Sequence, residues 1–219
     1  MPYVFAALLC AFAAAYAIKR RSGSLLSRVF YKCAASVSFL LLAVSIHTGM
    51  PHGYYTLIVA GLCASLAGDV CLLFADRGEG FLLGGMAAFA AAQGFYIAGF
   101  WMIASPSWVD AIFFSALMVL AFVLLRTRRI KAGHSAAALW GYAALLCLMT
   151  ARAVSMLWAA HMPMLFGIFA AAGGMLFAAS DVLLGAEQRT GSPLAGSLST
   201  IAYYAAQGLL ALTVQFAMP

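Results

Sequence analysis

The sequence predicts an all-α membrane protein of eight transmembrane helices, built as a parallel 4+4 internal repeat with both termini outside. Three observations lead to this prediction. Of the 219 residues, 66% are hydrophobic and only 8% are charged, whereas a soluble domain is nearer one quarter charged. Lys and Arg gather in alternate connections between apolar stretches, and two short motifs recur at nearly the same spacing. A chain with so few charges cannot cover a water-facing surface, so its solvent is lipid.

Eight apolar segments are long enough to cross a bilayer, which takes roughly 20 residues each. We expect the helices at residues 3–18, 29–47, 54–74, 81–103, 108–125, 136–158, 163–185 and 196–217. Turn residues or charges separate them, as in Gly49-Met50-Pro51 and Ser105-Pro106. Eight spans take about 160 residues, so residues 1–219 form a single membrane domain. We expect the first stretch to be a retained helix and not a signal peptide, because its basic residues follow it.

The orientation follows from the positions of the basic residues. Eleven of the 12 Lys and Arg residues belong to the first, third, fifth and seventh connections, with Lys32 counted in the first. The positive-inside rule makes these connections cytoplasmic and leaves both termini outside. The same rule explains the net charge of +6 without a nucleic-acid partner. The twelfth, Arg152, falls in the outer part of the sixth helix, where we expect its guanidinium to reach the outer surface instead of pairing with Asp69.

An internal repeat appears in two motifs. Asp181 follows Asp69 by 112 residues and Gln207 follows Gln93 by 114. The surrounding residues match: Ala67-Gly68-Asp69-Val70 with Ala179-Ser180-Asp181-Val182, and Ala91-Ala92-Gln93-Gly94 with Ala205-Ala206-Gln207-Gly208. The offset spans four helices, so both halves face the same way. We therefore expect two parallel repeats, about 3–103 and 108–217, related by an axis along the membrane normal, with a site at their interface.

Asp69 and Asp181 are the candidate catalytic residues. An acid near the bilayer centre costs about 3 kcal/mol on insertion scales, so a chain that keeps two has a use for them. Each lies near the cytoplasmic end of its helix, roughly 7 Å into the core at the α-helical rise. We expect the two to meet in one cavity open to the cytoplasm, where neighbouring carboxyl groups divide into an acid and a base. The competing interpretation is two buried acids satisfied by hydroxyl and backbone groups.

Nearby polar side chains are candidate substrate-binding residues. Ser65 lies one turn before Asp69 and shares its face, whereas Ser180 is adjacent to Asp181 and does not. Intramembrane serines often bond their own backbone, and amides often link helices, so both roles stay open. The set comprises Ser65, Gln93, Tyr96, Ser180, Tyr203, Tyr204 and Gln207.

The sequence indicates no metal site and no cofactor. The four histidines, His47, His52, His134 and His161, lack metal-ligand spacing. The five cysteines are scattered through apolar segments without paired spacing, so we interpret them as packing residues. Motifs of nucleotide-binding proteins are absent.

Three segments resemble the YhhN family of membrane proteins, which includes the animal lysoplasmalogenases. They run from Ser65 to Leu72, from Phe177 to Leu184 and from Tyr203 to Leu210. Length and helix count agree over nearly the whole chain. One departure concerns the fourth helix, where the family often has a histidine one turn before a tyrosine. Here Gln93 precedes Tyr96, which puts a histidine-dependent mechanism in doubt.

The resemblance implies hydrolysis of the vinyl ether bond of a lysoplasmalogen, or of a related single-chain lysolipid ether. The products would be a fatty aldehyde and glycerophospho-ethanolamine or -choline. The implied partners are a lysophospholipid substrate and membrane lipids, in a bacterial inner membrane. A homo-oligomer is left open.

Other functions fit the same residues. Paired acids in parallel repeats also suit a proton- or cation-coupled transporter. Ala67-Gly68-Asp69 is similar to an intramembrane aspartyl protease signature, although no later Pro-Ala-Leu follows. A purely structural protein would tolerate Asp→Asn at both sites.

Overall fold

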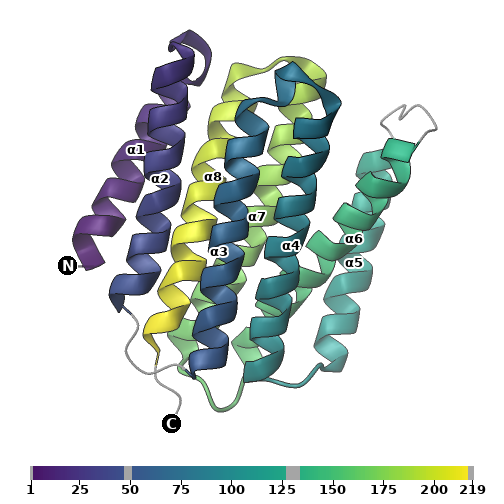
Figure 1. Cartoon of the computed structure of the whole chain (residues 1–219). Coiled ribbons are helices and arrows are strands. Elements are labelled where there is room, and N and C mark those ends of the chain that lie inside the picture. Colours follow the sequence, from purple (N-terminus) through teal and green to yellow (C-terminus); the bar gives the residue numbers. More distant parts are fainter. Residues whose placement is uncertain (1, 47–50, 127–133, 217–219) are drawn as a thin grey trace.

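The computed structural model describes residues 2–46, 51–126 and 134–216. Within these ranges the chain forms eight α-helices and short 3-10 turns, which confirms the predicted all-α fold with eight helices. The helices lie side by side as long rods (Figure 1). They are α1 (Pro2–Ser22), α2 (Leu25–Ile46), α3 (His52–Leu73), α4 (Glu79–Ile103), α5 (Trp108–Arg126), α6 (His134–Ser155), α7 (Met164–Thr190) and α8 (Pro193–Leu212).

The helices have the length and composition of membrane spans. Seven of those described are long and apolar enough to cross a bilayer, and the apolar part of α5, Trp108–Leu124, is shorter. Large apolar side chains face outward, among them Val44, Val119 and Phe122. An apolar outer surface is costly in water and favourable in lipid. The chain is therefore a multi-pass membrane protein.

The two ends of the bundle differ in charge. α1 begins and α8 ends at the same end (Figure 1). The opposite end carries the α1–α2, α3–α4 and α7–α8 connections, and α5 ends and α6 begins there. These are the connections in which the sequence concentrates Lys and Arg. Which end faces the cytoplasm remains the prediction of the positive-inside rule.

Two helices extend beyond their predicted ends at residues 18 and 185. α1 runs through Lys19 and Arg20 to Ser22, and α7 runs to Thr190. Those predicted ends are wrong because charge marks where a helix leaves lipid, not where its backbone hydrogen bonding stops. α7 ends at Gly191, whose φ of 68° suits glycine. On the α7 extension, Glu187 accepts hydrogen bonds from Arg20 at 3.0 and 2.7 Å, which ties α7 to α1.

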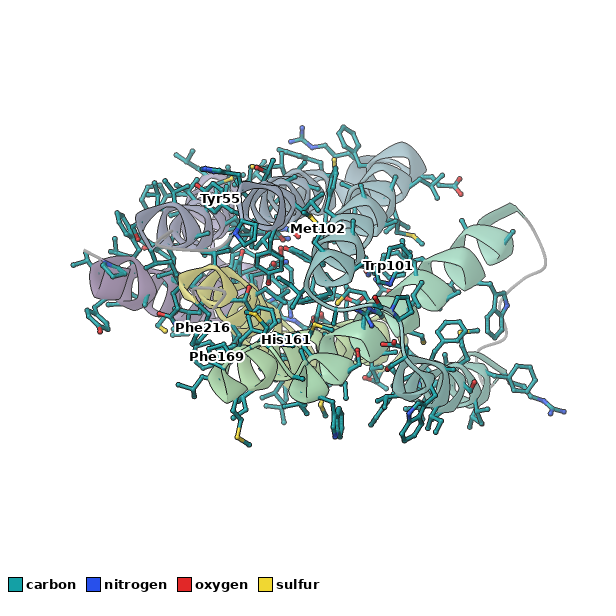
Figure 2. All side chains as sticks on the ribbon, turned by 90° about the horizontal axis from the view of Figure 1, so that it is seen from below. Tyr55, Trp101, Met102, His161, Phe169 and Phe216 are labelled. Carbon is teal, nitrogen blue, oxygen red and sulfur yellow. The ribbon has the colours of Figure 1, made fainter. Side chains whose placement is uncertain are left out.

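The centre of the bundle consists of the α3–α4 and α7–α8 hairpins, with α2 packed on α8 and α6 on α4. The α1–α2 pair and the α5–α6 pair flank this centre on opposite sides (Figure 1). Seen along the bundle from the end where α1 begins, Phe169 and Phe216 lie together (Figure 2), with ring centroids 5.7 Å apart. The core is rich in fully buried aromatic side chains, including Tyr54, Phe100, Phe166, Phe177 and Tyr204.

Arg152 does not reach the outer surface, so the expectation of a snorkelling arginine is wrong. Its side chain is 1% exposed. Nη1 donates to both carboxylate oxygens of Asp110 at 2.9 and 2.8 Å, and Nη2 donates to the carbonyls of Phe100 and Ala104 at 3.1 and 2.7 Å. The end of α4 and the first turn of α5 thus supply the acceptors that water or head groups would otherwise provide. A pocket of about 430 Å³ borders this ion pair.

Candidate functional site

Asp69 lies at the centre of a buried polar cluster that links α2, α3 and α8. One carboxylate oxygen accepts hydrogen bonds from Ser36 Oγ and from the Tyr203 hydroxyl, both at 2.7 Å. The other lies 3.3 Å from Lys32 Nζ. Lys32 and Ser36 are one turn apart on α2 and so share a face. All three contacts are with donors, which suits a carboxylate as acceptor.

Lys32 belongs to this cluster and not to a cytoplasmic connection, so its assignment to the first connection is wrong. It lies in α2 and is 8% exposed. The Tyr204 hydroxyl donates to the Lys32 carbonyl at 3.2 Å, and the ammonium lies 5.6 Å from the centre of the Tyr16 ring. The count of basic residues grouped Lys32 with those of the first connection, although it falls inside the apolar segment predicted at 29–47. Asp69, across the interface between α2 and α3, allows Lys32 to be buried, because a buried ammonium needs an anionic partner.

Three of the predicted substrate-binding residues form a second cluster, on α3, α4 and α8. Tyr96 donates to Gln207 Oε1 at 2.7 Å, and Gln207 Nε2 donates to Ser65 Oγ at 2.9 Å. Ser65 Oγ and the Tyr96 hydroxyl are 3.4 Å apart. All three side chains are fully buried. The amide of Gln207 therefore links helices, which is the structural role that the sequence left open.

Gly61 makes room for this cluster, and filling that space should be costly. A Cβ at Gly61 would overlap the ring of Tyr96. We expect Gly61→Ala to lower the free energy of unfolding by about 1–3 kcal/mol through overpacking. Denaturant or thermal unfolding of the purified protein measures this. Gly94→Ala is the control: no heavy atom lies within 4 Å of its Cβ position, so we expect no loss. Equal stability of the two variants would contradict the tight contact.

Asp181, on α7, has a different environment. It is partly exposed, and the Tyr142 hydroxyl of α6 donates to one carboxylate oxygen at 2.5 Å. The hydroxyl of the neighbouring Ser180 donates to the Phe177 carbonyl, one turn earlier on α7, at 2.7 Å. The Ser180 carbonyl accepts from Ser199 Oγ at 2.8 Å. Ser180 therefore bonds the backbone of its own helix, which is one of the two roles that the sequence left open.

Gln93, on α4, is fully buried, and neither its amide nitrogen nor its oxygen has a hydrogen-bond partner within the described part of the chain. Its helix, α4, packs against α6, which carries Tyr142. Gln93 and Gln207 lie in matching Ala-Ala-Gln-Gly tetrapeptides, yet they differ: the amide of Gln207 has partners at both ends and that of Gln93 has none.

The two acids are connected through aromatic side chains. Tyr203, which binds Asp69, packs edge-on against Phe177 with ring centroids 5.9 Å apart. Phe177 lies one turn before Asp181 on α7. Among the described residues, no hydrogen bond or ion pair joins the two carboxyl groups directly. That they share one cavity stays a prediction.

Sequence reasoning missed three polar neighbours of the acids: Lys32, Ser36 and Tyr142. A signal existed for the first two. Both fall within the apolar segment predicted at 29–47, at a spacing that places them on one helix face. A lysine inside a span calls for a partner. Tyr142 carries no such signal, because a tyrosine in an apolar helix is unremarkable until its neighbour across the interface is known.

Comparison with known protein families gives a match over most of the chain. The model of the YhhN family matches residues 27–214. This range contains both acids and all the polar neighbours described above except Tyr16. No curated protein and no solved structure matches the chain. Because the family model covers most of the sequence, the chain belongs to the YhhN family, the lysoplasmalogenase-like membrane family.

Proposed function

We propose that the protein is a membrane hydrolase that cleaves the vinyl ether bond of lysoplasmalogens. The products are a fatty aldehyde and glycerophospho-ethanolamine or -choline. Membership of the YhhN family carries the proposal, because that family is associated with lysoplasmalogenase activity. The two carboxyl groups held within the spans support it, because this chemistry requires an acid and a base where the aliphatic chain joins the glycerol.

Vinyl ether hydrolysis begins with proton transfer to carbon. The proton adds to the β-carbon of the enol ether, and the adjacent carbon becomes an oxocarbenium ion. Water adds to that carbon and loses a proton, which gives a hemiacetal. The hemiacetal breaks its bond to the glycerol oxygen and releases aldehyde and alcohol. A general acid and an anionic group that stabilises the cation and activates water are the parts required, as in glycoside hydrolysis.

We assign these two roles to Asp69 and Asp181. Asp69 receives three donors, including the Lys32 ammonium, and such contacts favour an anion. Asp181 accepts a hydrogen bond from one phenol, and no cation of the described residues forms an ion pair with it. The single aliphatic chain of the substrate lies among the apolar helices, and its head group stays near the basic end of the bundle.

The parallel 4+4 repeat and the orientation complete the proposal. The reciprocal packing of α2 on α8 and of α6 on α4 supports the repeat. So do the contacts of each acid with the preceding helix, Asp69 with α2 and Asp181 with α6. The basic connections face the cytoplasm and both termini lie outside, in a bacterial inner membrane.

A turnover assay tests the function. Purified protein in detergent is expected to release aldehyde from a lysoplasmalogen. The matched 1-O-alkyl lysolipid, which has a saturated ether, should give none, because it has no enol carbon to protonate. A transporter would release no aldehyde from either lipid but would move substrate or protons across proteoliposome membranes. Flux without aldehyde release would replace the hydrolase proposal by the transporter.

A further inference from the structure

In the part of the chain that the structure describes, Gln93 is the buried side chain with two hydrogen-bonding atoms that lack a partner. It is 0% exposed, and its donor and acceptor atoms are both unpaired. Leaving an amide unpaired in an apolar interior is unfavourable, because the group has lost water and gained no partner. Gln207, in the equivalent place on α8, has partners for both ends. The unpaired amide of Gln93 therefore suits a hydrogen-bond partner from outside the chain, such as a bound substrate.

Gln93 and Asp181 lie on facing sides of α4 and α7, so a ligand bound by Gln93 would lie beside Asp181. Phe89, one turn before Gln93, packs edge-on against Phe177, one turn before Asp181, with ring centroids 6.2 Å apart. Residues four apart share a helix face, so the faces of α4 and α7 that carry Gln93 and Asp181 are turned toward each other. Tyr142 comes from α6, which packs on both α4 and α7, and its hydroxyl donates to Asp181.

The chemistry of this group selects a neutral hydroxyl. A carboxamide offers donors and an acceptor at once, and an alcohol can pair with both. No cation of the described residues pairs with Asp181 or Gln93, so a phosphate is poorly matched here. The Asp69 cluster, in contrast, is already saturated with donors.

We propose that Gln93, Tyr142 and Asp181 form the subsite for the free glycerol hydroxyl of the lysolipid, with Gln93 as the residue that binds it. The inference rests on the proposed function. That hydroxyl lies on the carbon next to the one that bears the vinyl ether. Holding it at Gln93 places the enol carbon close to Asp181, which then donates the proton. Gln93 is a substrate-binding residue here and takes no proton itself.

The test compares two substrates in two variants. The substrates are a lysoplasmalogen and its analogue in which hydrogen replaces the glycerol hydroxyl. In the wild type we expect kcat/KM to be at least about tenfold lower for the analogue, because the amide then stays unpaired. In Gln93→Leu the kcat/KM for the lysoplasmalogen should fall to that for the analogue. The ratio of the two kcat/KM values should therefore approach one. Gln93→Met provides the same comparison if the leucine variant does not fold.

Gln207→Leu is the matched control. It removes an amide that the chain itself has paired, so it should lower the melting temperature and leave the substrate ratio as in the wild type. Gln93→Leu, which removes an unpaired amide, should not lower the melting temperature. If Gln93→Leu keeps the wild-type ratio of kcat/KM for the lysoplasmalogen to kcat/KM for the analogue, the proposal is overturned.

A binding measurement separates this subsite from the reaction. A saturated 1-O-alkyl lysolipid should raise the melting temperature of the wild type more than its deoxy analogue does, and Gln93→Leu should lose that difference. If no aldehyde is formed but the two lysolipids differ in their effect on the melting temperature as expected, the proposed function fails and the subsite stands. If aldehyde is formed and Gln93→Leu keeps the difference, the subsite fails alone.

Discussion

Replacing Asp181 or Asp69 by asparagine is expected to lower aldehyde release by about a hundredfold or more, the range in which a positioned acid or base contributes to a reaction. Asparagine keeps the shape of the side chain but can neither give up nor accept the proton. In Asp181→Asn the Tyr142 hydroxyl can still donate to the amide oxygen, so the packing of α6 on α7 is retained. The measurement is aldehyde formation under single-turnover conditions, with protein matched for melting temperature.

The controls separate chemistry from folding. Asp76→Asn changes an exposed acid just after α3, and we expect wild-type turnover. Asp69→Asn leaves the Lys32 ammonium buried without its carboxylate, which is destabilising in itself. The double variant with Lys32→Met removes that effect and should fold better while it stays inactive. If either single asparagine variant keeps near-wild-type turnover, the paired-acid mechanism is wrong.

The largest effect on stability is expected at Arg152. Arg152→Met should lower the free energy of unfolding by about 3–5 kcal/mol, the usual cost of removing one partner of a buried ion pair. The substitution removes the guanidinium that donates to the Asp110 carboxylate and to the carbonyls of Phe100 and Ala104. Unfolding in a denaturing detergent, followed by circular dichroism, measures the loss.

A second substitution shows whether the ion pair is responsible. Adding Asp110→Asn to Arg152→Met removes the unpaired charge and should recover part of the lost stability. Arg77→Gln is the matched control: Arg77 is exposed and its guanidinium lies over the Phe74 ring at 4.9 Å, so we expect a loss below about 1 kcal/mol. If Arg152→Met is no less stable than Arg77→Gln, the buried pair does not hold α4, α5 and α6 together.

Local pattern explains why the helices were predictable. Each span is a run of about 20 apolar residues, and lipid leaves a backbone in such a run only its own hydrogen bonds to make. The helix ends were less predictable, as α1 and α7 show, because charged residues such as Arg20 and Glu187 continue a helix in water. Their pairing with each other joins residues far apart in the chain.

Among the candidate site residues, the sequence located Asp69 and Asp181 through their cost in lipid and their repetition. It also pointed to Tyr203, which binds Asp69, and to Ser65, Tyr96 and Gln207, which bind one another. It could not show that Gln207 has hydrogen-bond partners and Gln93 has none, because the two residues lie in separate copies of one tetrapeptide, Ala-Ala-Gln-Gly. The number of partners an amide finds depends on neighbouring helices that the tetrapeptide does not contain.

Hydropathy and charge act through composition along the chain, so the amino-acid sequence was enough to predict a helical membrane protein with two acids within its spans. Which groups those acids meet depends on how the helices pack: Lys32, Ser36 and Tyr203 at Asp69, and Tyr142 at Asp181. The pairing of Arg152 with Asp110 inside the bundle depends on that packing too. A buried polar group must find its partner across a helix interface, and packing alone fixes which side chains face each other there.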